Sequence, residues 1–170
     1  MTKWSFSVSA LTPVAVADNT NFTDSGYMAL QGGSSTQINN IWEVSVGGQA
    51  TSSAPTFLML AYDSTVGATL TALSTPNSNG SLNPATAALS AIPTGFIAST
   101  TKPKRSNSVT VAKMQFSFNA FGGVAFWRAG DEGSVFQILG NAASTGEASL
   151  SAFTGGTPGA INAHIIYEPK

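Results

Sequence analysis

The side chains that could carry catalysis are few in this chain and widely spaced. His164 is the only histidine among 170 residues, and it stands in NAHIIYE, a stretch whose pattern predicts a strand. A Ser-His-Asp triad would need a buried acid and an exposed hydroxyl nucleophile beside it, and no G-x-S-x-G motif supplies the nucleophile turn. We therefore interpret His164 as a partly exposed strand residue. We expect no catalytic residue and no enzymatic activity.

Acids that are close in sequence offer two further kinds of site. Asp131 and Glu132 are adjacent in a glycine-flanked turn, where their side chains diverge, so a turn role is favoured over glycoside hydrolysis. Asp18 and Asp24 flank an Asn-rich loop whose oxygens could bind calcium, but the spacing matches no EF-hand. The chain has no Cys, which excludes disulfides and zinc-thiolate sites. We expect neither a cofactor nor a bound metal.

Basic residues gather in one segment of the chain. Positions 64–130 hold no acid but five bases, and Lys102, Lys104 and Arg105 lie together in TKPKRSN. Pro103 favours an extended backbone there, which keeps the three side chains apart. The segment is either a solvated loop or a docking segment for an acidic partner. We predict that Lys102, Lys104 and Arg105 bind a partner. No nucleic acid is expected, because interleaved aromatic residues are missing and the net charge is -1.

The elements that would position these residues are predicted to be strands. Apolar and small polar residues alternate with a period of two, as where Trp4, Phe6 and Val8 alternate with serines. Glycine-rich turns separate such stretches. The predicted strands cover 4–8, 41–46, 57–62, 109–118, 124–128, 135–139, 148–153 and 163–168. In 109–118, the side carrying Met114, Phe116 and Phe118 is expected to face the core.

The composition favours the same fold class. Charged residues make up 9% of the chain, against about 25% in average soluble domains, and there are 22 Ser and 19 Thr. Such a sequence does not suit a helical bundle, whose exposed faces need charged helix-forming residues. We predict an all-β, single-domain antiparallel sandwich over residues 1–170, with a jelly roll as the leading topology. An insertion over 64–108 is predicted to carry a short helix over 85–91.

Several segments taken together resemble a family of viral proteins. They are the hydroxyl-rich N-terminal strand, FNAFGGVAFW at 118–127, and GEASLSAFTGGTPGAINAHIIYEP at 146–169. Together with the glycine-cornered strands, they resemble small β-rich auxiliary capsid proteins of tailed bacteriophages, which decorate or cement the head. The resemblance implies a structural virion protein, made in the host cytoplasm and located on the capsid surface. It also implies binding to the major capsid protein or another virion protein, and a homo-oligomer, with a trimer favoured.

A carbohydrate-binding sandwich, for example in a phage fibre, is the alternative function. Exposed Trp or Tyr beside Asn or Asp would serve it, and Tyr27, Trp42 and Trp127 are the candidates; the strand patterns around the two Trp favour the core for them. No apolar run approaches the 18–20 residues or so of a membrane helix, and the N-terminus lacks the hydrophobic region of a signal peptide. We therefore expect no membrane partner.

Overall fold

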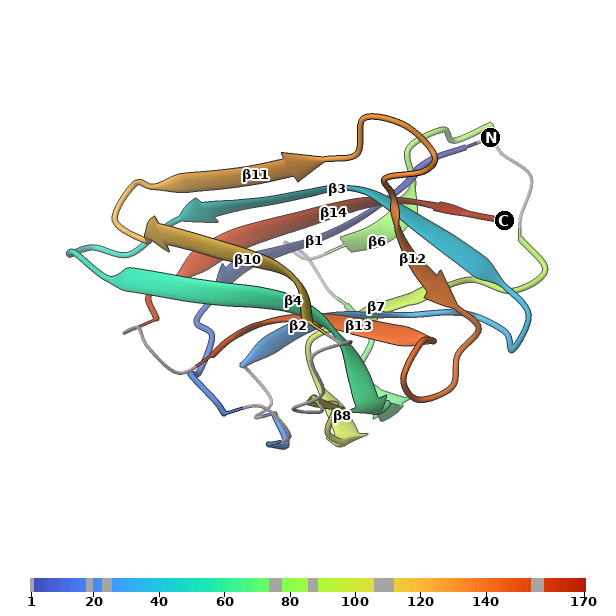
Figure 1. Cartoon of the computed structure of the whole chain (residues 1–170), viewed down its shortest axis with the longest axis horizontal. Helices are drawn as coiled ribbons and strands as arrows, with labels where there is room; N and C mark the ends of the chain where they lie inside the picture. The colour runs from blue at the N-terminus through green and yellow to red at the C-terminus, as the bar shows by residue number, and fades with distance from the viewer. Residues whose placement is uncertain are drawn as a thin grey trace.

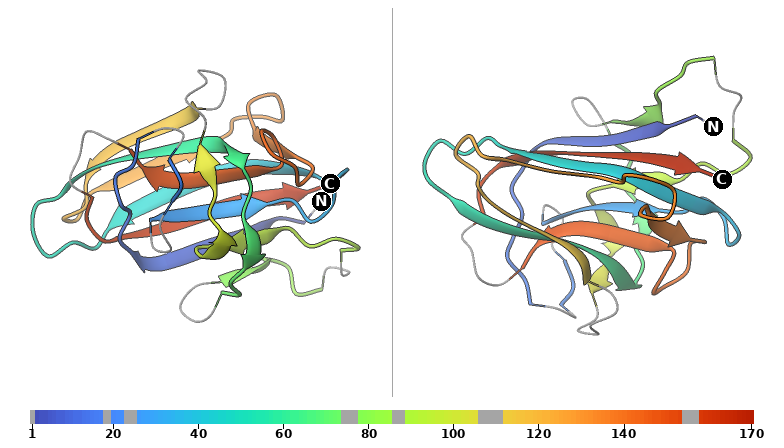
Figure 2. Two further views of the ribbon diagram at one scale, coloured as in Figure 1. Left: turned by 90° about the horizontal axis from the view of Figure 1, so that it is seen from below. Right: turned by 45° about the horizontal axis from the view of Figure 1, so that its top comes forward.

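The computed structural model describes residues 2–17, 20–22, 26–73, 78–85, 89–105, 112–153 and 158–170. These residues form an antiparallel β-sandwich of two packed sheets (Figures 1 and 2), as the sequence predicted. They contain no helix. The helix predicted over 85–91 is not seen: residues 85 and 89–91 are not helical, and 86–88 lie outside the described residues. Two helical turns are too short to be stable without packing support.

The first sheet has the order β11-β3-β14-β1-β6, and β12 pairs with the other half of β3. Its long central strands lie next to partners that are far away in sequence, such as β1 beside β14. The strands of this sheet are β1 (Trp4–Leu11), β3 (Ile38–Gly48), β6 (Ser78–Ser81), β11 (Val124–Arg128), β12 (Phe136–Leu139) and β14 (Ile161–Pro169).

The second sheet has the order β10-β4-β13-β2-β7, and β9 pairs with the end of β4. A separate two-stranded sheet joins β5 and β8. The strands of these sheets are β2 (Tyr27–Gln31), β4 (Pro55–Thr65), β5 (Ala68–Leu70), β7 (Thr94–Phe96), β8 (Ser99–Thr101), β9 (Lys104–Arg105), β10 (Ala112–Asn119) and β13 (Glu147–Ala152). The sequence reading missed β2, because four of its five residues are buried and the strand therefore shows no alternation.

The main core lies between the two sheets and follows from the period-two pattern. In β1, Phe6 and Val8 are buried while the serines between them face outward. In β10, Met114, Phe116 and Phe118 pack against the core, which confirms the face predicted for that segment. Alternate residues of a strand point to opposite faces of its sheet. The serine-rich side of the first sheet is therefore its outer face.

The segment between β4 and β10 supplies the smaller strands. Within it, β6 extends the first sheet and β7 extends the second, whereas β9 returns to pair with β4. A second, smaller apolar cluster, formed by Phe22, Tyr27, Ala29 and Phe96, lies apart from the main core. The second sheet therefore contributes buried residues from both of its faces, while the first sheet keeps a polar outer face.

Candidate binding surface

Rows of small side chains cross the outer face of the first sheet. In one row, neighbouring strands in turn contribute Phe126, Ser45, His164, Ser7 and Ser78 as register partners. The hydroxyls of Ser7 and Ser78 are hydrogen-bonded at 3.0 Å. Since register partners point to the same face of a sheet, the row presents hydroxyl groups and one imidazole to the outside, with a phenyl ring at the β11 end.

A pocket of about 300 Å³ lies over the central strands of this face. Its polar lining consists of Ser7, Ser9, Ser45, Asn162 and His164. The Ser9 hydroxyl donates to Asn162 Oδ1 at 3.1 Å, which fixes the amide across two strands. Val124 of β11 supplies an apolar wall. Hydroxyl, amide and imidazole groups in one depression can donate to and accept from a neutral polar ligand.

His164 occupies the strand position that the sequence predicted. It is half-buried on β14, and the residues opposite it on both neighbouring strands are Ser45 and Ser7 rather than an acid. Its Nε2 atom is buried and has no hydrogen-bond partner within the described part of the chain. The register partners of His164 are therefore two serines, and neither of them is the carboxylate that orients a catalytic imidazole.

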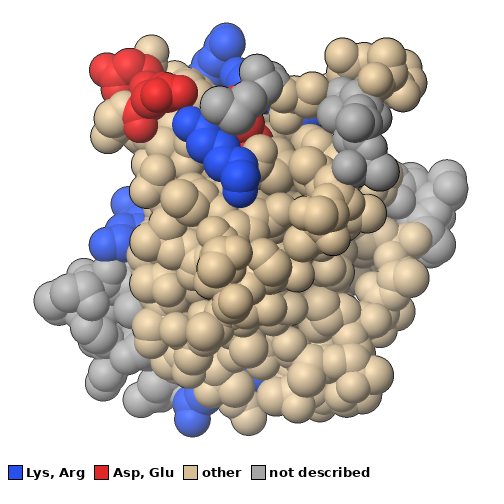
Figure 3. Space-filling model, turned by 90° about the vertical axis from the view of Figure 1, so that its right-hand side faces the viewer, with Lys and Arg blue, Asp and Glu red and all other residues tan. Residues whose placement is uncertain are grey.

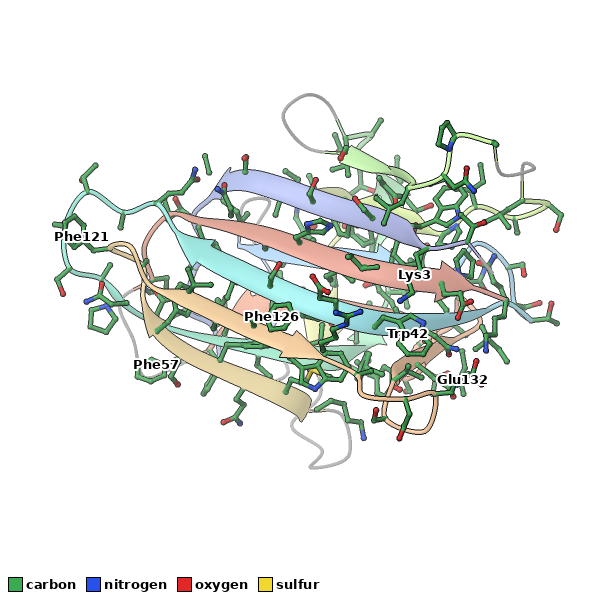
Figure 4. All side chains as sticks on the ribbon, turned by 90° about the horizontal axis from the view of Figure 1, so that it is seen from above. Lys3, Trp42, Phe57, Phe121, Phe126 and Glu132 are labelled. Carbon is green, nitrogen blue, oxygen red and sulfur yellow. The ribbon has the colours of Figure 1, made fainter. Side chains whose placement is uncertain are left out.

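An apolar margin borders the pocket on the β11 side. Val124 is 75% exposed and Phe126 is 57% exposed, and both lie on the outer face. Phe121, in the turn that joins β10 to β11, is 61% exposed; Figure 4 shows it at the far tip of the hairpin, apart from Phe126. Gly122 has a φ of +78° in this turn, a conformation that glycine adopts without strain. The hairpin therefore holds β11 at the sheet edge with its apolar side chains uncovered.

The aromatic residues considered for glycan binding do not form an exposed platform. Trp42 is half-buried; its Nε1 donates to Glu168 Oε2 at 3.2 Å, and Lys3 Nζ lies 4.6 Å from its ring centroid. Trp127 packs against the main core, as its strand pattern predicted. Tyr27 is fully buried. Phe126, which the sequence reading assigned to no site, is instead the register partner of the pocket residue Ser45 and is exposed.

The basic segment lies on the second sheet, away from the pocket. Lys104 and Arg105 form β9, which pairs with Asp63 and Thr65 at the end of β4. Lys102 and Lys104 are half-buried, and Lys102 Nζ donates to a backbone carbonyl at 2.9 Å. Partner binding by these two lysines stays a prediction. The structure does not bring them together with the serine-rich face.

Arg105 differs from the expectation for a splayed docking residue, because its side chain is fully buried. Its Nη2 donates to the carbonyl oxygens of Val16 at 3.0 Å and Ala152 at 3.3 Å, and its guanidinium lies 5.3 Å from the Phe22 ring centroid. These acceptors come from segments distant in sequence, which the local pattern of TKPKRSN could not show. In this structure Arg105 is a structural residue rather than part of a docking surface.

A buried carboxyl pair lies close to Arg105. Asp63 on β4 and Glu147 on β13 are both fully buried and lie opposite each other on adjacent strands, so their carboxyl groups interact electrostatically. Ser149 Oγ donates to Asp63 Oδ1 at 2.7 Å. Glu147 Oε2 accepts from the Gly67 backbone N–H at 2.9 Å. Because the two acids are 84 positions apart in sequence, no spacing could have identified the pair.

Burial makes this pair unusual in its ionisation. It raises the pKa of Asp63 well above its ordinary value, and repulsion by Glu147 adds to this, while Arg105 offsets part of it. Burial raises the pKa of Glu147 to about 7, although hydrogen bonds, including those from Gly67 and Gln31, oppose the change. Two carboxylates cannot both ionise easily in a poorly solvated site, so the pair holds a proton near neutral pH.

The other acids considered for chemistry do not form a site. Asp131 and Glu132 are exposed in a turn closed by Ser134, and Glu132 pairs with Lys170 at 3.3 Å. This agrees with the turn role predicted for them. Asp18 and Asp24, the candidates for calcium, lie outside the described residues.

Two wider findings complete the description of the surface. Among the residues described, no three His, Cys, Asp or Glu side chains come together in a way that could hold a metal ion. In the same residues, no helix has the length and apolar character needed to cross a membrane.

No family model matches the chain, and no curated protein is similar to it in sequence.

Proposed function

We propose that this chain is a structural virion protein, an auxiliary capsid protein that decorates or cements the head of a tailed bacteriophage. It acts through binding surfaces rather than a catalytic site, and it binds the major capsid protein or another virion protein. The observation that carries the proposal is the outer face of the first sheet, which is rich in serine and bordered by exposed Val124 and Phe126.

The topology supports this proposal. Counting only the eight longest paired strands in chain order, the first sheet runs 1-8-3-6 and the second 2-7-4-5. We infer that the sandwich is a jelly roll, in which strands pair in this nested manner; viral capsid domains and lectins use it. Fold alone does not determine function, so the argument depends on the surface.

The distribution of charge supports binding to neighbours. Figure 3 shows most of the charged side chains at one end of the molecule towards the top, with a few Lys or Arg side chains at the left and lower margins and a broad uncharged surface between them. Copies of a nearly neutral protein can lie side by side without strong repulsion. A protein that binds only the assembled lattice stabilises it by mass action, without any bond being made or broken.

This function can be tested on virions purified from cultures that produce the protein, by mass spectrometry and by cryo-electron microscopy. The expected result is a chain present in many copies, with density on the outer surface of the head. A chain made in infected cells but missing from purified virions would contradict the proposal. Replacing Val124 and Phe126 by Ser should lower occupancy on the head, whereas the same change at Ile92, which is 54% exposed and precedes β7 of the second sheet, should not.

Carbohydrate binding is the second candidate, and the pocket is the observation that favours it. Ser45, Asn162 and His164 offer hydrogen bonds to sugar hydroxyls, and Val124 with neighbouring Phe126 offers an apolar wall for the face of a sugar ring. A glycan array separates the two functions: bound glycans that are lost in His164→Ala would favour this one. An array without binding, together with high head occupancy, would favour the capsid role.

A further inference from the structure

Strand β11 forms one edge of the first sheet, and its outer edge carries unpaired backbone groups. Gly123 and Ala129, which flank the strand, both hydrogen-bond to β3. Hydrogen-bonded positions alternate along an antiparallel pair. The N–H and C=O groups of Val124, Phe126 and Arg128 therefore point away from β3. Among the described residues, no hydrogen bond outside the strand pairs occupies them.

The other sheet ends lack this combination of a free edge and apolar side chains. β6 has four residues and β7 has three, so each offers little edge to pair with. β10 is long, but its outward side chains are polar and include exposed Lys113 and Gln115. Short strands and edge lysines are devices by which proteins prevent edge-to-edge pairing. β11 is only one residue longer than β6, but it carries no lysine, and its exposed residues are Val124, Phe126 and a terminal Arg128.

We propose that β11 is a self-association edge, where a second copy of this chain adds its own β11 antiparallel to the first and continues the sheet across a two-fold axis. With the axis at Phe126, this residue lies opposite its counterpart, and Val124 lies opposite Arg128 of the other copy. The three outward-pointing residues of each strand then form about six hydrogen bonds between the copies.

Charge and symmetry favour a second copy over an unrelated strand. An antiparallel edge is its own complement, because its outward donors and acceptors match those of the same strand turned around the axis. Arg128 is the only charged residue in β11, and the two copies of it stand about 14 Å apart along the joined strands. The pairing therefore brings no like charges together and covers the exposed Phe126 ring.

The joined sheet has a consequence for the candidate binding surface. A two-fold axis perpendicular to a sheet keeps the outer faces of both copies on the same side, so both pockets face one partner. Two linked sites bind a repeating surface more tightly than one. The inference thereby deepens the proposed function, and it gives a dimer in place of the trimer implied by the resemblance. Solution measurements test it separately from binding to virions.

Sedimentation and light scattering over a range of concentrations test the contact with matched variants. Phe126→Lys places two ammonium groups together at the axis, so it should make the protein monomeric. Phe121→Lys makes the same chemical change at a residue of similar exposure off the edge, so it should dimerise as wild type does. Circular dichroism and melting of both variants confirm folding, which the exposure of both side chains favours.

A mixing experiment tests the two-fold register itself. Phe126→Lys and Phe126→Glu should each be monomeric alone, while their equimolar mixture should dimerise, because position 126 faces itself across the axis. Hydrogen exchange should show the amides of Val124, Phe126 and Arg128 protected in the dimer. A wild-type protein that stays monomeric at high concentration would overturn the proposal. A dimer that survives Phe126→Lys, or leaves these amides unprotected, would do the same.

Discussion

The buried acid Glu147 should make the stability of this protein fall as the pH rises from acidic to neutral. The change that tests this is Glu147→Gln, which keeps the shape of the side chain and removes its ionisation. The new amide oxygen can accept the Gly67 and Gln31 hydrogen bonds that Oε2 accepts now. Its NH₂ group takes the place of Oε1, which has no partner within the described residues, and can donate to Asp63.

The magnitude follows from the pKa of Glu147. Its ordinary value of 4.5 rises to about 7 in the folded protein, so the folded state binds more protons than the unfolded state between these values. Stability that depends on the proton is fully present below pH 4.5 or so and is lost as the pH rises through about 7. At 1.36 kcal/mol for each pKa unit, the loss is at most about 3 kcal/mol. Asp63 also makes the protein less stable as the pH rises, since its pKa is raised in the folded state as well.

Thermal and urea unfolding at several pH values from 5 to about 8 measures this effect. We expect wild type to lose stability across the range and Glu147→Gln to lose much less. At about pH 8 the melting temperature of the variant should exceed that of wild type by at most about 6–12 °C, since about 1 kcal/mol corresponds to about 2–4 °C for a protein of this size. Glu132→Gln removes an acid that is 72% exposed and should behave as wild type. A wild-type stability that rises with pH, or a variant less stable than wild type at the upper end, would refute the reasoning.

The remaining predictions concern a close backbone contact, the basic segment and the pocket. Gly48→Ala should destabilise the fold by about 1–3 kcal/mol, because the added Cβ would collide with the backbone oxygen of Ala120. Gly47→Ala has open space around its Cβ, so chemical denaturation should show a much smaller loss of stability. Changing Lys102 and Lys104 to Ser should weaken the salt dependence of head occupancy, because charges that dock on an acidic partner act chiefly on association and are screened by salt. The melting temperature should fall slightly, since the hydrogen bond from Lys102 Nζ to the Ser99 carbonyl is lost; equal occupancy of both proteins at low and high salt would show that the segment does not dock. His164→Gln should leave head occupancy largely unchanged, because Gln can still donate and accept hydrogen bonds in the pocket, and a complete loss of function in a folded variant would contradict a non-enzymatic role.

The strands could be predicted from the sequence because side-chain alternation is a local property. Where Phe6 and Val8 alternate with serines, or Phe116 and Phe118 with polar residues, one face must be buried whatever the strand pairs with. Each predicted strand is present in the described residues, with most boundaries moved by a few residues; residues 109–111 of the strand predicted over 109–118 lie outside them. The turn role of Asp131 and the strand position of His164 followed from the same local reasoning.

Strand order, and what the strands bring together, depended on the tertiary structure. Pairing between β1 and β14 joins the two ends of the chain, and it places His164 between serines to form a pocket wall. Pairing between β4 and β13 places Asp63 beside Glu147, and β9 carries Arg105 into the same buried region. Sequence spacing predicted an exposed Arg105, because the carbonyl oxygens that bind it belong to Val16 and Ala152. Contacts between residues so far apart follow from register and packing, which no local pattern encodes.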